Sequence, residues 1–152
     1  MTTEIHFYHL LTTPLEKALP RLMDKALKSG MRAVIYGTEQ QVDMLDRTLW
    51  TFTPNAFLPH GTHKDPMPEE QPVYLSPKLE NPNGATLLVI THGEQPPIDE
   101  AFTRVIDIFD GGNENEVAAA RQRWSDYKKS GHPLTYIKQN DEGGWEKAAE
   151  VA

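Results

Sequence analysis

The 152-residue chain contains no cysteine, so it has no disulfide framework, no thiolate metal site and no cysteine nucleophile. It also lacks an apolar run of the length that a membrane span needs, and its first residues do not join a basic region to an apolar one. The chain has 15 lysine and arginine residues against 22 aspartate and glutamate residues, which gives a net charge of −7. These absences favour a soluble protein of the cytoplasm and disfavour broad contact with DNA or membranes.

Motifs for nucleotide binding and catalysis are missing too. Neither Gly-x-Gly-x-x-Gly nor a Walker pattern follows an early predicted strand, and there is no Gly-x-Ser-x-Gly elbow. His60 and His63 have a spacing that can suit a metal, but they lie in a proline-rich stretch without a His-Glu-x-x-His pattern. His92 and Glu94 follow an apolar strand, at the end where α/β sheets place ligands. A small α/β enzyme therefore stays open as an alternative, whereas no metal or other cofactor is predicted.

What the chain does contain is an alternation of short apolar strands with amphipathic helices. Strands are predicted over 5–10, 32–37, 72–76, 85–91, 104–109 and 134–138, the fourth central and the last at an edge. Helices are predicted over 14–29, from 38 to about 50, over 98–102 and from 113 or 115 to 130. Residues 51–72 are expected to be irregular. The pattern predicts an α/β fold, as a single three-layer domain over 1–142 with a mainly parallel sheet flanked by helices, Rossmann-like without a phosphate-binding loop. Residues 143–152 are expected to form a flexible tail.

The last predicted helix is the most informative segment, because basic and aromatic side chains occur in it together. Its apolar stripe consists of Val117, Ala120, Trp124 and Tyr127. Its basic residues are Arg121, Arg123, Lys128 and Lys129. At helical spacing Arg121 and Lys128 flank the Trp124 indole. A basic and aromatic patch on an acidic chain suits an acidic peptide with an apolar side chain. The alternative is that Trp124 and Tyr127 are core residues and the cations a solvated face.

Three motifs occur in a recognisable order and spacing: Leu-Asp-Arg-Thr-Leu-Trp at 45–50, Phe-Leu-Pro-His at 57–60, and a closing helix at 121–131. The first two resemble the signature of the chi subunit of bacterial DNA polymerase III. The closing helix is similar to that family's Arg-x-Arg-[Tyr/Trp]-x-x-Tyr-[Lys/Arg]-x-x-Gly ending. The resemblance covers residues from about 5 to 133.

The resemblance implies a non-catalytic accessory subunit of the DNA polymerase III holoenzyme, acting in DNA replication. Chi proteins join the clamp-loader side of the replicase, usually through the psi subunit, to single-stranded DNA-binding protein. They hold the acidic C-terminal tail of that protein, so contact with DNA is indirect and no small-molecule substrate is implied. By position, the tail-binding residues are Arg121, Trp124, Trp50, Phe109 and Lys128. The interface with psi or another partner is expected at Phe57, Pro59 and His60.

The chain departs from the family pattern at two positions of the closing helix. Ser125 follows the aromatic residue where members commonly carry a cation, and Val117 stands at another position where a cation can occur. A less positive tail site predicts weaker or more salt-sensitive binding. A general docking module that uses Phe57 and has lost tail binding is a further alternative.

Overall fold

The computed structural model describes residues 3–51 and 59–151 of the chain. In the described residues the helices are α1 (Leu15–Lys28), α2 (Glu39–Thr51) and α3 (Glu114–Lys129), with a short 3-10 helix η1 (Pro68–Glu70). The strands are β1 (Glu4–Leu10), β2 (Ala33–Tyr36), β3 (Gly61–Thr62), β4 (Val73–Ser76), β5 (Leu87–Ile90), β6 (Arg104–Asp110), β7 (Leu134–Gln139) and β8 (Trp145–Val151). The structure confirms the predicted α/β fold with one mostly parallel sheet between layers of helices.

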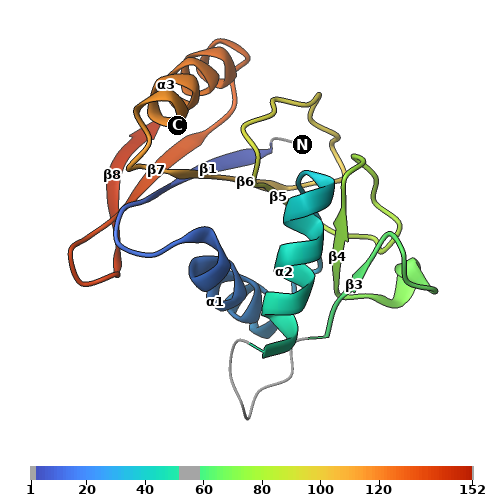
Figure 1. Cartoon of the computed structure of the whole chain (residues 1–152). Coiled ribbons are helices and arrows are strands. Elements are labelled where there is room, and N and C mark those ends of the chain that lie inside the picture. Colours follow the sequence, from blue (N-terminus) through green and yellow to red (C-terminus); the bar gives the residue numbers. More distant parts are fainter. Residues whose placement is uncertain (1–2, 52–58, 152) are drawn as a thin grey trace.

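All strands join one sheet in the order β3-β4-β2-β5-β6-β1-β7-β8. Every neighbouring pair is parallel except β7 and β8, which are antiparallel. The strand β5 lies in the middle, as its uninterrupted apolar sequence predicts. Parallel strands put all their carboxyl ends at one edge of the sheet, so the turns that lead into α1, α2 and α3 lie at that edge (Figure 1).

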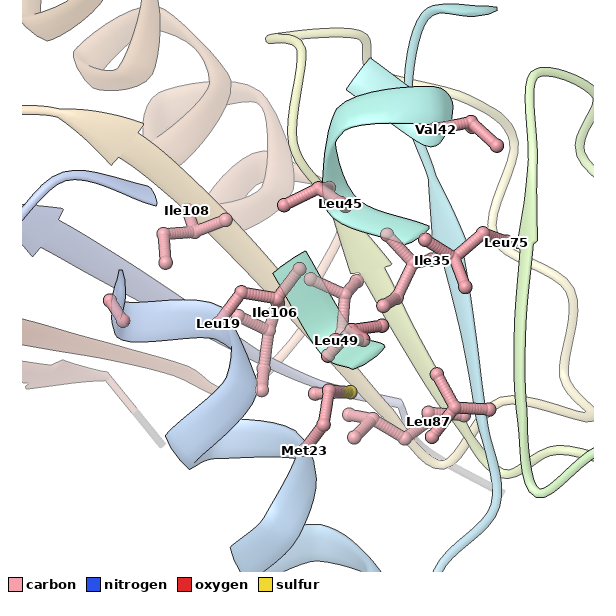
Figure 2. Packing of buried hydrophobic residues seen from close by; sticks show 14 of the residues in the cluster. Leu19, Met23, Ile35, Val42, Leu45, Leu49, Leu75, Leu87, Ile106 and Ile108 are labelled. Atoms are coloured by element: carbon pink, nitrogen blue, oxygen red, sulfur yellow. The ribbon is translucent and has the colours of Figure 1, made fainter. Parts of the chain in front are cut away.

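The face covered by α1 and α2 has an aliphatic core. Alternation along the strands sends Ala33 and Ile35 of β2 to this face and Val34 to the other. The helices contribute buried residues at helical spacing, among them Leu19 and Met23 of α1. Figure 2 shows the labelled leucine, isoleucine, valine and methionine side chains of the helices and strands gathered in this layer.

The opposite face is covered by α3, which lies across the sheet from α1 (Figure 1). Its core is richer in aromatic residues: Phe7, Tyr74, Phe102, Phe109 and Tyr127 are all buried in it. Gly111 brings the turn before α3 close to the end of β1, since a Cβ at Gly111 would lie 2.1 Å from the His9 ring. This close approach fixes the start of α3 beside β1.

Four local predictions differ from the structure. Residues 98–102 form no helix, and Phe102 is a buried plug of the aromatic core instead. The stretch 51–72 includes β3 and η1 rather than irregular chain alone. The strand β7 is not an edge strand, because β8 pairs with it. Residues 145–151 form β8 where a loose tail was expected, since a turn at Gly143, with φ +85°, folds the chain back.

The loop between β1 and α1 shows why the fold has no phosphate-binding loop. The backbone N–H groups of Leu11, Thr12 and Thr13 all donate to the Gln139 side-chain oxygen, at 3.0, 2.8 and 3.0 Å. Successive amides of this kind hold a phosphate in nucleotide-binding relatives of the fold. Here the neutral Gln139 side chain of β7 occupies the position that a phosphate would take, so these amides have their hydrogen-bond acceptor within the chain.

Candidate functional site

The helix α3 is defined by signals at both of its ends. The Asn113 side chain accepts hydrogen bonds from the backbone N–H groups of Asn115 and Glu116, as expected of an N-cap residue. At the other end Gly131 adopts φ +84°, a conformation that favours glycine and ends the helix. Acidic residues in the first turn and lysines in the last turn complement the helix dipole.

The apolar stripe of α3 faces the sheet. Ala120 and Tyr127 are buried, while Val117 and Trp124 are half-buried at the border of the core. The Trp124 ring packs edge-on against Phe7, with ring centroids 5.4 Å apart. Tyr127 is therefore a core residue, whereas Trp124 combines a core contact with a surface that solvent reaches.

Arg123 does not belong to the basic surface. It is 5% exposed and donates from Nε and an Nη atom to the two carboxylate oxygens of Asp107, at 2.6 and 2.8 Å. A second Nη atom lies 3.4 Å from the Gly93 carbonyl oxygen. The sequence pattern that counted Arg123 with the exposed cations is wrong on this point. The signal was present, because Arg123 lies three residues after Ala120 and four before Tyr127, within the buried side of the helix.

Arg121 and Lys128 are exposed, as the sequence predicts. Their spacing of three and four residues from Trp124 puts them on the same side of the helix as the indole. Neither forms an ion pair with the residues that the structure describes. Their positive charge is thus free to act on a ligand.

Three residues that no sequence motif indicated complete this surface: His9 of β1, and Tyr136 and Lys138 of β7. The Tyr136 ring lies 5.8 Å from that of Trp124, and its hydroxyl is hydrogen-bonded to Nδ1 of His9. Alternation along β7 could indicate that Tyr136 and Lys138 share a face, but only the fold brings β7 beside β1 and beneath α3. We call Arg121, Trp124, Tyr136 and Lys138, together with the mostly buried His9, the α3 surface.

The pKa of His9 depends on the charged residues of the α3 surface. Burial lowers the pKa of His9 below its ordinary value of 6.5, and the positive charges of Lys138 and Arg121 lower it further. Asp110 opposes this effect. Burial raises the pKa of Tyr136, and the same Arg121 charge opposes this rise. Two cations from different elements therefore converge on one aromatic patch and favour a negative ligand there.

Phe109 lies beneath this patch rather than on it. Its side chain is 3% exposed, and its ring centroid lies 5.1 Å from that of His9 and 6.2 Å from that of Tyr136. It supports the aromatic residues above it. Of the residues expected to touch an acidic tail, Phe109 has the least surface to offer.

Trp50 lies on the other side of the sheet from Arg121. It is near the end of α2, is 54% exposed, and has its ring centroid 4.6 Å from that of His60. The His60 side chain is fully buried and its Nε2 lies 3.0 Å from the Asp46 carboxylate. Pro59, next to His60, is half-buried, and Phe57 lies outside the described residues. The structure thus groups Trp50 with the residues expected at the second interface and does not bring it to Arg121.

The histidines considered for a metal have separate partners. His63 lies 3.1 Å from Glu39, while His60 is paired with Asp46. Among the described residues no group of three or more histidine, aspartate or glutamate side chains has an arrangement that could hold a metal ion. The spacing of the two histidines therefore does not become a shared site in the part of the chain that is described.

His92 lines a cavity of about 460 Å³ at the carboxyl edge of the sheet. Burial lowers the pKa of His92, and its ring lies edge-on to Tyr36 at 4.5 Å. The other ionisable residues that line the cavity are Arg123, which is paired with Asp107, and Glu116, which lies 3.4 Å from the Asp110 amide. Among these described lining residues no nucleophile is paired with a base. The hypothesis of a small α/β enzyme is therefore supported by a cavity but by no group of catalytic residues in it.

Fold and surface together define a Rossmann-like α/β domain in which the Gln139 side chain occupies the loop after β1 and exposed cations border an aromatic patch. A family model described as "DNA polymerase III chi subunit, HolC" matches residues 1–135. The chain belongs to this family of chi subunits, which places it in DNA replication.

Two relatives support the assignment. The chain is 40% identical over 88 residues to a probable DNA polymerase III subunit chi of Rickettsia prowazekii (strain Madrid E), over 57% of this chain and 53% of that protein. It is 32% identical over 116 residues to the DNA polymerase III subunit chi of Pseudomonas aeruginosa, over 75% of this chain and 79% of that protein. The match thus spans about half the length of the Rickettsia protein and most of the Pseudomonas protein. In the described residues no helix is both long and apolar enough to cross a membrane.

Proposed function

We propose that the protein is a non-catalytic adaptor that links the clamp-loader complex of DNA polymerase III to single-stranded DNA-binding protein, by holding the acidic C-terminal tail of the latter on the α3 surface. The observation that supports this best is the position of Arg121, exposed and without an ion pair among the described residues, beside the half-exposed Trp124 indole. A guanidinium binds a terminal carboxylate through two hydrogen bonds, and an indole provides an apolar wall for the last side chain.

Lys138 offers a replacement for the cations that the closing helix lacks. Ser125 and Val117 reduce the charge of the helix itself, but Lys138 reaches the same aromatic patch from β7, since it acts on His9 together with Arg121. Lys128 adds a third cation two turns from Arg121 along α3. The tail site is then built by a helix and a strand, and its affinity depends on salt because all three cations are exposed.

The second surface consists of Trp50 and Pro59, on the α2 side of the sheet, with the buried His60 ring packed against Trp50. Trp50 is one of the few large apolar residues that are exposed in the described chain, and large aromatic residues are the usual centres of protein interfaces. We propose that psi or another clamp-loader component binds here, with Phe57 as the further contact that the family resemblance implies. Two partners on opposite faces of one sheet can be bound at the same time, as an adaptor requires.

The test of tail binding is a fluorescence-anisotropy titration with the labelled acidic C-terminal peptide of single-stranded DNA-binding protein. Arg121→Ala should weaken binding about tenfold or more, since a charge-assisted bidentate pair is lost. Lys17→Ala, which removes an exposed cation from α1, is the matched control and should bind as the wild type does. No saturable binding at low salt would contradict tail binding while leaving the family assignment in place.

Trp50→Ala tests the separation of the two surfaces. Because Trp50 and Arg121 lie on opposite faces, Trp50→Ala should leave the peptide affinity unchanged and weaken co-purification with the psi or clamp-loader partner. Arg121→Ala should have the reverse pattern. Loss of peptide binding in both variants would mean that Trp50 belongs to the tail site after all.

A further inference from the structure

A groove lies between α1 and the β7–β8 hairpin, on the face of the sheet opposite the α3 surface. It has a volume of about 420 Å³, within the usual range of sites for small ligands and protruding side chains. Its lining residues are Tyr8, Arg21, Leu22, Lys25, Ile137, Gly143, Trp145 and Lys147. In Figure 1 the first helix and the turn that joins β7 to β8 lie on the same side of the molecule.

The floor of this groove is aromatic and aliphatic. The rings of Tyr8 and Trp145 pack edge to face, with centroids 5.1 Å apart at an interplanar angle of 76°. Trp145 is only half-buried, and Leu22 and Ile137, on either side of it, are half-buried as well. A partly open apolar floor of this kind can bind one apolar side chain of a partner.

The rim of the groove is positive on a chain that is negative overall. Three of the lining residues are basic and none is acidic, although the chain has a net charge of −7. Arg21 and Lys25 lie one helical turn apart, are exposed, and form no ion pair with the residues that the structure describes. Lys147 is 2.6 Å from Glu150, so its charge is partly compensated. The open charges of the rim are therefore those of α1.

We propose that this groove binds an acidic peptide segment that carries one aromatic or large aliphatic side chain. The apolar side chain lies on Trp145 and Tyr8, and carboxylates on either side of it pair with Arg21 and Lys25. A peptide fits better than a nucleic acid, because the cations are few and occupy one rim, while the rest of the chain would repel a long polyanion.

The groove is independent of the tail site and of the family assignment. It lies across the sheet from Arg121, and one of its walls comes from residues 137–147, beyond residue 135 where the family match ends. The peptide that it binds needs no free C-terminal carboxylate, because its charges are on side chains. Success or failure here thus leaves the proposed function to its own test.

The experiment is an anisotropy titration of the full chain with a fluorescein-labelled peptide of five aspartates around one phenylalanine, amidated at its C-terminus. Arg21→Ala/Lys25→Ala should weaken binding about tenfold, since each exposed cation contributes a few-fold. Lys17→Ala/Lys28→Ala removes two other cations of α1 and should leave binding unchanged. A peptide with alanine in place of phenylalanine should bind clearly more weakly.

Four outcomes would overturn the proposal. They are no saturable binding at low salt, an equal loss in the two double variants, a loss caused by Arg121→Ala instead, and binding of a labelled thymidine oligonucleotide in place of the peptide. The second outcome would indicate non-specific attraction to α1, and the third would assign the peptide to the α3 surface. The last would make the groove a site for single-stranded nucleic acid.

Discussion

The two faces of the central sheet are covered in different ways. On one face α1 and α2 pack an aliphatic layer of leucine, isoleucine, valine and methionine (Figure 2). On the other, α3 covers aromatic residues together with a buried arginine–aspartate pair. A close-packed aliphatic layer depends on shape and volume, whereas a buried charge pair depends on both of its partners being present. The comparison indicates that the first face mainly stabilises the fold, while the second also fixes the position of α3, the helix that we propose binds the tail.

The largest effect is expected from the buried pair. Asp107→Ala leaves the Arg123 guanidinium buried without its partner and should lower the free energy of unfolding by about 3–5 kcal/mol. Urea unfolding followed by circular dichroism measures this. The double variant Asp107→Leu/Arg123→Met should recover much of the loss, since apolar residues of similar size can replace a buried ion pair. If the single variant lost less than about 1 kcal/mol, the pair would not fix α3 as described.

The aliphatic face should respond to a change of volume. Leu45 of α2 is 0% exposed, and Leu45→Ala should cost about 2–5 kcal/mol through lost burial and the cavity that remains. Leu11→Ala makes the same chemical change at a residue that is 44% exposed, so it should cost much less. Equal losses in the two variants, measured by thermal or urea unfolding, would show that this layer is not closely packed.

The smallest effect concerns pH, and His9 of the α3 surface is the residue at which it is measured. Because the pKa of His9 is lower in the folded than in the unfolded chain, the unfolded chain binds more protons as the pH falls below about 6.5, so stability is lost as the pH falls through the folded pKa. His6 and His92 also have lowered pKa values and act in the same direction. Arg121→Ala should raise the pKa of His9, measured by NMR titration of its ring protons, whereas Lys17→Ala should not. No change in Arg121→Ala would mean that Arg121 does not act on this patch.

Much of the fold follows from local sequence. The spacing of Leu19 and Met23 predicts α1, and the apolar run over 85–91 predicts the central strand, because side-chain periodicity reports which surface of an element is buried. The failures lie where no periodicity exists. The sequence 98–102 has a buried Phe102 but no helix, and β8 consists mostly of exposed residues, so only its pairing with β7 makes it a strand.

The candidate site was predictable in part. Arg121 and Trp124 follow from the closing helix and the family resemblance, and both are at least partly exposed there. Arg123 was misassigned, although an aspartate inside the apolar strand 104–109 was a sign that a buried partner was needed. Tyr136 and Lys138 belong to no motif. Trp50 was predicted in the tail site, but it lies on the α2 side of the sheet, across from Arg121.

The sequence by itself determined the three long helices and most of the strands, the alternation that makes a parallel α/β sheet, and the family, because each of these depends on neighbours along the chain. Only the tertiary structure decided which cation of the closing helix is buried and which is free, because one α-helix presents Arg121 and Arg123 to different surroundings. It also decided that Lys138 of β7 lies near the same aromatic patch as Arg121, since both charges act on His9. Trp50 lies across the sheet from both cations. Strand order and the choice of face are set by packing over long sequence distances, and no local pattern encodes them.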